Sequence, residues 1–357
     1  MKGIIEPQHR ILLVLTGGTI CSFENENGER EADVSRAQTL IVKKFRESDS
    51  RFHSEESVAF DAVRPLNVLS ENMSTSNWNT LIGAMKSYDY ARYDGVILLH
   101  GTDTLAYSAS LLSVLLAGLK IPVFLVSSQL PIYMEGANGN ANFRAAVELI
   151  LGGVQPNVYA IYRNRETVDG AETNKMYVHY GAHLLQCANG SDNFYSCDMT
   201  EINEENPAFE GRASEGEPFL YRCGALSDCV LRITPYVGIN YRNFNLRGIR
   251  AVLHGTYHSY TLAVDVPKGG DRGQSVLSLK KRCDRHTPPI PLFLAPCNED
   301  AYGYETTGHI LRSGARAVYG MTAEMTYVKL LVGCSMGLDA DGLERFLNQE
   351  INGERIV

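Results

Sequence analysis

The chain has 357 residues, a formal net charge of −8, a hydrophobic content of 44% and a charged content of 21%. This is the composition of an ordinary globular protein, neither disordered nor fibrous, and the length favours two domains over one. The acidic balance disfavours a nucleic-acid partner, because neutralising phosphates requires concentrated lysine and arginine. The basic run Lys280–Arg282 is interpreted as a solvated helix end.

The sequence also indicates where the protein is located and whether its cysteines are reduced. The first ten residues contain no apolar segment of signal-peptide length and no small-residue cleavage site. No run of about 18 apolar residues occurs that would span a bilayer. The eight cysteines show no C-x-x-C spacing, which favours reduced thiols. We therefore expect a cytoplasmic protein that does not associate with membranes.

Strands and helices alternate in the first half of the chain. Apolar runs of strand length occur at 10–15, 57–65, 95–100, 123–127 and 158–162. Segments with helical spacing lie between them, at 78–88, 104–117 and 142–151. Near-continuous apolar strands that alternate with helices predict a parallel sheet covered on both faces. We therefore predict a larger, doubly wound α/β domain at residues 1–200.

The second half repeats the pattern on a smaller scale. A polar, acidic stretch with prolines and glycines predicts a linker at 201–220. Apolar runs then return at 228–233, 251–254 and 291–295, followed by a helical pattern at 322–332. A smaller C-terminal α/β domain at 221–357 is the expected fold.

Two short motifs follow two of the predicted strands. Thr16-Gly17-Gly18-Thr19-Ile20 ends the first apolar run, and His100-Gly101-Thr102-Asp103-Thr104 ends the third. Ligands bind α/β sheets at the ends of such strands. Paired glycines free the backbone to offer N–H groups to an anion, and a threonine hydroxyl beside a base can act as a nucleophile. The alternative is that each turn merely caps the next helix.

The order and spacing of four motifs carry a resemblance. They are T-G-G-T-I, Ser70-Glu71-Asn72-Met73, H-G-T-D-T, and Asp169-Gly170 with Lys175 five residues beyond the glycine. In these motifs the chain resembles the bacterial-type L-asparaginases, nearly from end to end, and is most similar to the type I cytoplasmic members.

The resemblance implies a catalytic set and a reaction. It implies that Thr19 attacks the side-chain amide of L-asparagine, assisted by a relay of Thr102, Asp103 and Lys175, with no cofactor and no metal. An acyl-enzyme would then be hydrolysed, releasing ammonia and L-aspartate. The chemistry is consistent on general grounds, because a threonine hydroxyl is a poor nucleophile unless a neighbouring group takes its proton.

The resemblance also implies the substrate-binding residues, which are Gly18, Ser70, Glu71, Gly101, Thr102 and Asp103. Ser70 matches the position that holds the α-carboxylate, while Asp103 and Glu71 match positions that touch the α-ammonium. A hydroxyl suits a carboxylate and a carboxylate suits an ammonium. The alternatives are a loop hydroxyl for Ser70 and a surface charge for Glu71.

The segment after T-G-G-T-I departs from the family. The family has a tyrosine there that reaches back to the nucleophile, whereas this chain has Glu29 and no tyrosine between Cys21 and Ala32. Another residue takes that role, or turnover is slower, or the substrate differs. The acidity of this segment predicts a mobile, solvated lid. Cys21 is interpreted as a small buried filler, with a reactive thiol as the alternative.

The family places Leu253–His258 at a neighbouring subunit's active site, so a homodimer or homotetramer is expected. His254 and His258 are interpreted as satisfied loop histidines because no third ligand has suitable spacing for a metal. Cys297 falls near the effector pocket of type I members, which raises the hypothesis of allosteric activation by asparagine.

Three alternative functions remain. The first is a glutaminase-asparaginase, since one methylene is discriminated by only about 1–3 kcal/mol. The second is a tRNA-amidotransferase-type subunit, disfavoured because that subunit has a domain before T-G-G-T whereas the motif here begins at residue 16. The third is a non-catalytic amino-acid-binding homologue, motivated by the missing tyrosine and opposed by the joint presence of Thr19, Thr102, Asp103 and Lys175.

Overall fold

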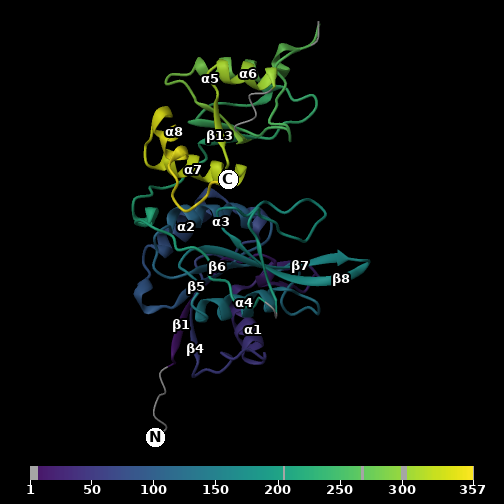
Figure 1. The fold of residues 1–357 in the computed structure, drawn as a ribbon, viewed down its shortest axis with the longest axis vertical. Helices are drawn as coiled ribbons and strands as arrows, with labels where there is room; N and C mark the ends of the chain where they lie inside the picture. Colours follow the sequence, from purple (N-terminus) through teal and green to yellow (C-terminus); the bar gives the residue numbers. More distant parts are fainter. Residues whose placement is uncertain (1–6, 204–205, 267–268, 299–303, 357) are drawn as a thin grey trace. The chain divides into compact units, whose positions relative to one another are not determined.

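The computed structural model describes residues 7–203, 206–266, 269–298 and 304–356. It divides into two compact units, Met1–Tyr221 and Arg222–Val357, each with its own sheet and hydrophobic core (Figure 1). Within the described residues, no helix combines the length and the apolar character that crossing a bilayer requires.

The first unit is built on one twisted sheet. Its strands are β1 (His9–Leu15), β4 (Val58–Val63), β5 (Gly95–Leu99), β6 (Val123–Val126), β7 (Val158–Val168), β8 (Ala171–Tyr180) and β9 (Thr200–Ile202). They lie in the order β4-β1-β5-β6-β7-β8-β9. The pairs from β4 to β7 are parallel, and β8 and β9 add antiparallel pairs at one edge.

Helices cover both faces of this sheet, which confirms the predicted doubly wound architecture. They are α1 (Val34–Arg46), α2 (Thr75–Met85), α3 (Leu105–Leu115) and α4 (Gly139–Leu151). In Figure 1, α2 and α3 lie on one face while α1 and α4 lie on the other. The apolar side chains of β1, such as Ile11 and Leu13, pack with Ile41 of α1 and Phe143 of α4. Burial of these runs on both faces explains why they lack a polar alternation.

The acidic segment after T-G-G-T-I folds into a hairpin, where the sequence predicts a mobile lid. Strands β2 (Ser22–Glu24) and β3 (Arg30–Ala32) pair antiparallel. Asn25 closes the turn, because its side-chain oxygen accepts hydrogen bonds from the backbone N–H groups of Asn27 and Glu29. Phe23 stacks on Tyr133 with the ring centroids 5.5 Å apart. An Asx turn and an aromatic anchor thus offset the repulsion between the glutamates.

The segment predicted as a linker packs along the first unit. Its first residues, Glu201 and Ile202, pair with β8 as part of β9. The Gln155 N–H donates to the Glu210 carbonyl at 2.8 Å, and the Ser214 N–H donates to the Pro156 carbonyl at 2.7 Å. The described part of this segment therefore belongs to the first unit, and the boundary between the two units along the chain falls between Tyr221 and Arg222.

The second unit is a smaller α/β fold, as predicted. Its strands are β10 (Val230–Ile233), β11 (Ala251–His254), β12 (Leu292–Cys297) and β13 (Arg316–Tyr319), in that order and paired parallel. Its helices are α5 (Val276–Asp284), α6 (Glu305–Arg312), α7 (Ala323–Ser335) and α8 (Ala340–Asn348).

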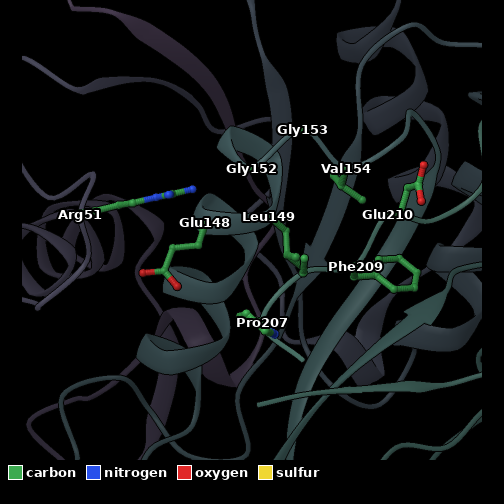
Figure 2. A pocket seen from close by; sticks show the side chains of 10 residues that line it. Arg51, Glu148, Leu149, Gly152, Gly153, Val154, Pro207, Phe209 and Glu210 are labelled. Atoms are coloured by element: carbon green, nitrogen blue, oxygen red, sulfur yellow. The ribbon is translucent and has the colours of Figure 1, made fainter. Parts of the chain in front are cut away.

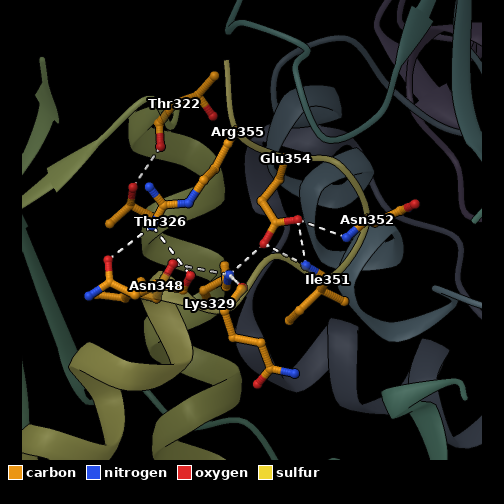
Figure 3. Close-up of polar contacts among 10 residues, drawn as sticks. Thr322, Thr326, Lys329, Asn348, Ile351, Asn352, Glu354 and Arg355 are labelled. Carbon is orange, nitrogen blue, oxygen red and sulfur yellow. Dashed lines mark hydrogen bonds and ion pairs between the residues drawn. The ribbon is translucent and has the colours of Figure 1, made fainter. Parts of the chain in front are cut away.

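A buried ion pair ties the end of the chain to α7 (Figure 3). The Lys329 ammonium lies 2.5 Å from a Glu354 carboxylate oxygen, and both side chains are almost fully buried. Lys329 also donates to the Gln349 carbonyl at 2.6 Å. Glu354 accepts hydrogen bonds from the backbone N–H groups of Ile351 and Asn352. Both charges are therefore satisfied, which is the condition for a buried pair to be tolerated.

Candidate active site

The two glycine-containing turns meet at the edge of the first sheet. β1 and β5 are parallel neighbours, so the turns that follow them emerge side by side. Gly18 has a φ of 78°, and a Cβ placed on it would lie 2.1 Å from the Gly101 Cα. A Cβ on Gly101 would lie 2.3 Å from the Ser70 hydroxyl oxygen. Only glycine fits at either position. Because Thr19 follows Gly18 and Thr102 follows Gly101, each threonine lies next to this backbone contact.

The role of Gly18 is close packing. Its backbone N–H donates to the Val68 carbonyl at 2.8 Å. That donor is therefore used within the protein, and the substrate-binding role that the resemblance implies for Gly18 stays a prediction.

Ser70 fixes Asp103. Ser70 begins the short 3-10 helix η2 (Ser70–Asn72) and is buried. Its hydroxyl donates to a carboxylate oxygen of Asp103 at 2.8 Å and accepts the Asp103 N–H at 3.2 Å. The Thr104 hydroxyl in turn donates to the Ser70 carbonyl at 3.0 Å. Glu71, the next residue, is exposed.

Of the four threonine hydroxyls in these two turns, two donate hydrogen bonds within the protein. Thr16 donates to the Leu99 carbonyl at 2.8 Å, and Thr104 is engaged with Ser70. Within the described residues, the Thr19 and Thr102 side chains have no such partner, and both are half-buried. These two hydroxyls are therefore the ones available for chemistry, in agreement with the choice of Thr19 over Thr16.

A cavity of about 240 Å³ opens beside the H-G-T-D-T turn. Its wall contains Thr102, Asp103, Gln129, Tyr162, Gln186 and Cys187. Residues 188–192 and Phe194 complete it. The predicted residues Thr102 and Asp103 thus share a small polar cavity with side chains that the sequence did not single out.

Lys175 pairs with two glutamates and is not among the residues that line this cavity. It lies on β8, where the register pairs it with Asn164 of β7. Its ammonium lies 3.3 Å from a Glu201 carboxylate oxygen and 3.8 Å from one of Glu166. These glutamates come from the strands on either side of β8, so the sheet itself surrounds the lysine with carboxylates. The structure brings Thr102 and Asp103 together in the wall of one cavity, and the part of the predicted relay that involves Lys175 stays a prediction.

Gln186 lies against Asp103 instead. Its side-chain amide nitrogen donates to the Asp103 backbone carbonyl. The sequence analysis did not single out Gln186, because it is an uncharged side chain outside the four motifs.

The buried His100 side chain stabilises the H-G-T-D-T turn through hydrogen bonds. Its Nδ1 lies 2.8 Å from the Gly101 carbonyl and its Nε2 lies 2.8 Å from the Ser108 hydroxyl, which accepts the Trp78 indole N–H at 3.0 Å. Burial lowers the pKa of His100 to about 4, so the ring is neutral near pH 7. The network assigns the proton to Nδ1, with Nε2 accepting from Ser108.

The cysteines near the site are not thiolates. Cys21 is fully buried, and burial raises the pKa of its thiol to about 12, which confirms it as a packed filler. Burial also raises the pKa of the Cys187 thiol, with Asp192 adding to the effect. In the second unit, burial raises the pKa of Cys297 to about 12. A nucleophilic role needs the thiolate, so threonine remains the better candidate.

The potential metal ligands have other partners. His183, Cys197 and Asp198 place their ligand atoms within 4.8 Å of one another. However, Asp198 already pairs with His183 at 2.7 Å and lies 3.7 Å from the Arg212 guanidinium, whose charge opposes a cation. His254 is bonded to Tyr241 and to the Gly255 carbonyl, so its reading as a satisfied histidine is confirmed. We assign a metal to neither set.

A second hollow of the first unit, about 640 Å³, lies at the C-terminal end of α4 (Figure 2). Arg51, Glu148 and Glu210 surround apolar side chains that include Leu149 and Phe209. It contains no hydroxyl or thiol nucleophile among its lining residues, so the candidate active site remains at the turns.

Comparison with known proteins gives a consistent result. Residues 10–182 match the family model described as asparaginase, N-terminal. The L-asparaginase of Thermococcus kodakarensis is 26% identical over 346 residues, covering 97% of this chain and 98% of that protein. L-asparaginase 1 of Escherichia coli is 25% identical over 361 residues, covering 96% and 97%.

The solved structures agree on the fold. The thermostable L-asparaginase from Thermococcus kodakarensis superposes with a TM-score of 0.75 at 22% identity, covering 98% of this chain and 99% of that one. Two α/β units, with threonine-bearing turns meeting at the edge of the larger sheet, define the class. Residues 10–182 therefore match the N-terminal domain of the asparaginase family, and the chain is similar to L-asparaginases over nearly its whole length.

Proposed function

We propose that this protein is an amidohydrolase that converts L-asparagine to L-aspartate and ammonia through an acyl-enzyme on Thr19. The observation that carries the proposal is the contact of Gly18 with Gly101, which sets two unpartnered hydroxyls, Thr19 and Thr102, on adjoining turns. The two relatives named L-asparaginase, which align with almost the whole chain, support it.

The proposed reaction has two halves. In the first, the Thr19 oxygen bonds to the amide carbon, the C–N bond breaks and ammonia leaves with a proton. In the second, water cleaves the ester and releases L-aspartate. Thr102 relays the proton from Thr19 to the leaving ammonia, and Asp103 stays ionised beside the substrate's ammonium in the same wall. The described wall contains no lysine, so we expect slower turnover than a lysine-assisted site would give.

The direct test removes the nucleophile. Thr19→Ala is expected to lower ammonia release from L-asparagine by at least about 1,000-fold, because loss of a nucleophile removes the covalent pathway. Release is measured on purified protein with an ammonia-coupled assay. The matched control is Thr39→Ala, on the exposed face of α1, which is expected to keep wild-type activity. Retention of activity in Thr19→Ala, with wild-type melting behaviour, would remove Thr19 from the mechanism.

A second candidate is a non-catalytic amino-acid-binding homologue. It is favoured by one observation: Gln186, which cannot accept a proton, contacts Asp103, while Lys175 pairs with two glutamates. Binding of L-asparagine without ammonia release would establish it. The same assay with L-glutamine tests the glutaminase-asparaginase alternative.

We further propose a cytoplasmic homodimer or homotetramer that acts on a small molecule without a cofactor. The expectation of self-association follows from the family resemblance. Light scattering coupled to size-exclusion chromatography measures it, and a monomer at micromolar concentration would contradict it.

A further inference from the structure

We propose that Gln186 and Tyr162 form an amino-acid recognition site in the cavity beside Asp103, with the Gln186 side-chain carbonyl accepting a hydrogen bond from the ligand's α-ammonium. The inference rests on the proposed function and names how this chain holds the substrate.

Gln186 has one satisfied end and one unsatisfied end. Its amide nitrogen donates to the Asp103 carbonyl. Its carbonyl oxygen is buried and has no partner within the described residues. The amide cannot be turned round, because two carbonyl oxygens would then face each other. A buried acceptor without a donor costs free energy, so this atom requires a donor from a ligand.

Tyr162 is the complementary group in the same wall. Its side chain is 1% exposed, and its hydroxyl is likewise without a partner among the described residues. The neighbouring Asn138 is already engaged with Ser128, with the Gln129 N–H and with the Arg163 carbonyl. Phe194 holds the ring edge-on at 4.8 Å. The hydroxyl is therefore fixed in place as a donor for a ligand carboxylate.

The charge of the wall selects the orientation of the ligand. Asp103 and Asp192 line the cavity, and the described wall contains no lysine or arginine. An ammonium is stabilised beside these carboxylates, so the ligand's ammonium faces them and its carboxylate faces the Tyr162 hydroxyl. The Gln186 amide is anchored on the Asp103 backbone carbonyl, which keeps the Gln186 carbonyl in the same wall as the Asp103 carboxylate. The ligand class is a small α-amino acid with a free ammonium group.

The experiment compares two ligands that differ only in the ammonium. L-aspartate and succinate are titrated into wild type, Gln186→Leu and Tyr162→Phe by calorimetry. We expect Gln186→Leu to weaken L-aspartate about tenfold and succinate less than twofold, since a hydrogen bond to a charged donor is lost only for L-aspartate. Tyr162→Phe is expected to weaken both ligands by similar factors. Gln155→Leu, outside the cavity, is the matched control.

Kinetics separate this inference from the proposed function. In Gln186→Leu, KM for L-asparagine is expected to rise about tenfold, with kcat changed less than threefold. Equal weakening of L-aspartate and succinate, or an unchanged KM in an active enzyme, would overturn the inference alone. If the wild-type protein releases no ammonia but Gln186→Leu still weakens L-aspartate selectively, the proposed function alone is overturned. Gln186→Met, which retains length, repeats the comparison if the leucine variant melts early.

Discussion

Each unit has a His-Gly-Thr turn at the end of one strand of its sheet. His100-Gly101-Thr102 follows β5, and His254-Gly255-Thr256 follows β11. In each, the histidine is fully buried, its Nδ1 contacts the next glycine's carbonyl and its Nε2 contacts a hydroxyl. Burial lowers the pKa of both rings to about 4. The buried histidine is therefore a means of fixing a strand end.

The surroundings of the glycine and the threonine distinguish them. A Cβ on Gly101 would meet Ser70 at 2.3 Å, whereas on Gly255 the nearest atom, of Pro235, lies 3.3 Å away. The Thr256 hydroxyl donates to the Pro296 carbonyl at 2.7 Å, while Thr102 faces the cavity. A histidine-glycine-threonine turn thus becomes a candidate active site only where a second turn packs against it.

The largest predicted effect breaks that packing. Gly101→Ala forces the backbone away from Gly18 and Ser70, so ammonia release from L-asparagine is expected to fall at least about 100-fold, with about 1–3 kcal/mol of destabilisation from overpacking. Gly255→Ala is expected to cost less than about 1 kcal/mol. Activity assays and urea denaturation measure the two variants in parallel. Equal losses of stability in both would show that the two turns are equally crowded.

The second predicted effect concerns the buried histidine that both turns contain. The histidine pKa is about 4 in each fold against about 6.5 when unfolded. Between these values the unfolded chain binds more protons, so the free energy of unfolding falls as the pH is lowered from 6.5 to 4. Each buried histidine contributes up to about 3 kcal/mol of this loss, which levels off below pH 4. His179, also buried with a pKa near 4, adds to the slope.

Urea denaturation at pH 7.5, 6 and 5 measures this dependence, with a probe for each unit because two units need not unfold together. His100→Gln is expected to reduce the slope of the first unit's transition, and His254→Gln that of the second. Both variants lose stability at pH 7.5, so the slope is the informative quantity. An unchanged slope in both would mean that the histidines are not held neutral.

The sequence predicted the parts of this comparison that depend on local pattern. Buried strands such as 95–100 appear as apolar runs, and glycines at a strand end indicate a turn. The contact of Gly18 with Gly101 comes from the adjacent parallel strands β1 and β5 in the structure. Helix α1 was not predicted, although its buried positions, Val34, Ala37, Ile41 and Phe45, recur at helical spacing.

The surroundings of Lys175 could not be predicted from the sequence. Counting from Asp169-Gly170 placed a lysine at the expected spacing, but the position of its side chain depends on how far the β7–β8 hairpin extends. The register that pairs Asn164 with Lys175 sets the lysine between Glu166 and Glu201. Such a register is fixed by tertiary packing, which a motif does not contain. Gln186 carries no charge and so gave no signal of its own.

The smallest predicted effect is the difference in unfolding free energy when the hydroxyl of Thr256 or of Thr102 is removed. Thr256→Val removes a hydrogen bond to the Pro296 carbonyl, so it is expected to cost about 0.5–1 kcal/mol in urea denaturation. Thr102→Val removes a hydroxyl with no partner in the described protein, so its unfolding free energy is expected to change by less than about 0.3 kcal/mol while ammonia release falls. A stability loss in Thr102→Val equal to that in Thr256→Val would mean that the first hydroxyl, too, serves the fold. A hydroxyl that contributes nothing to the fold is the one kept free for a substrate.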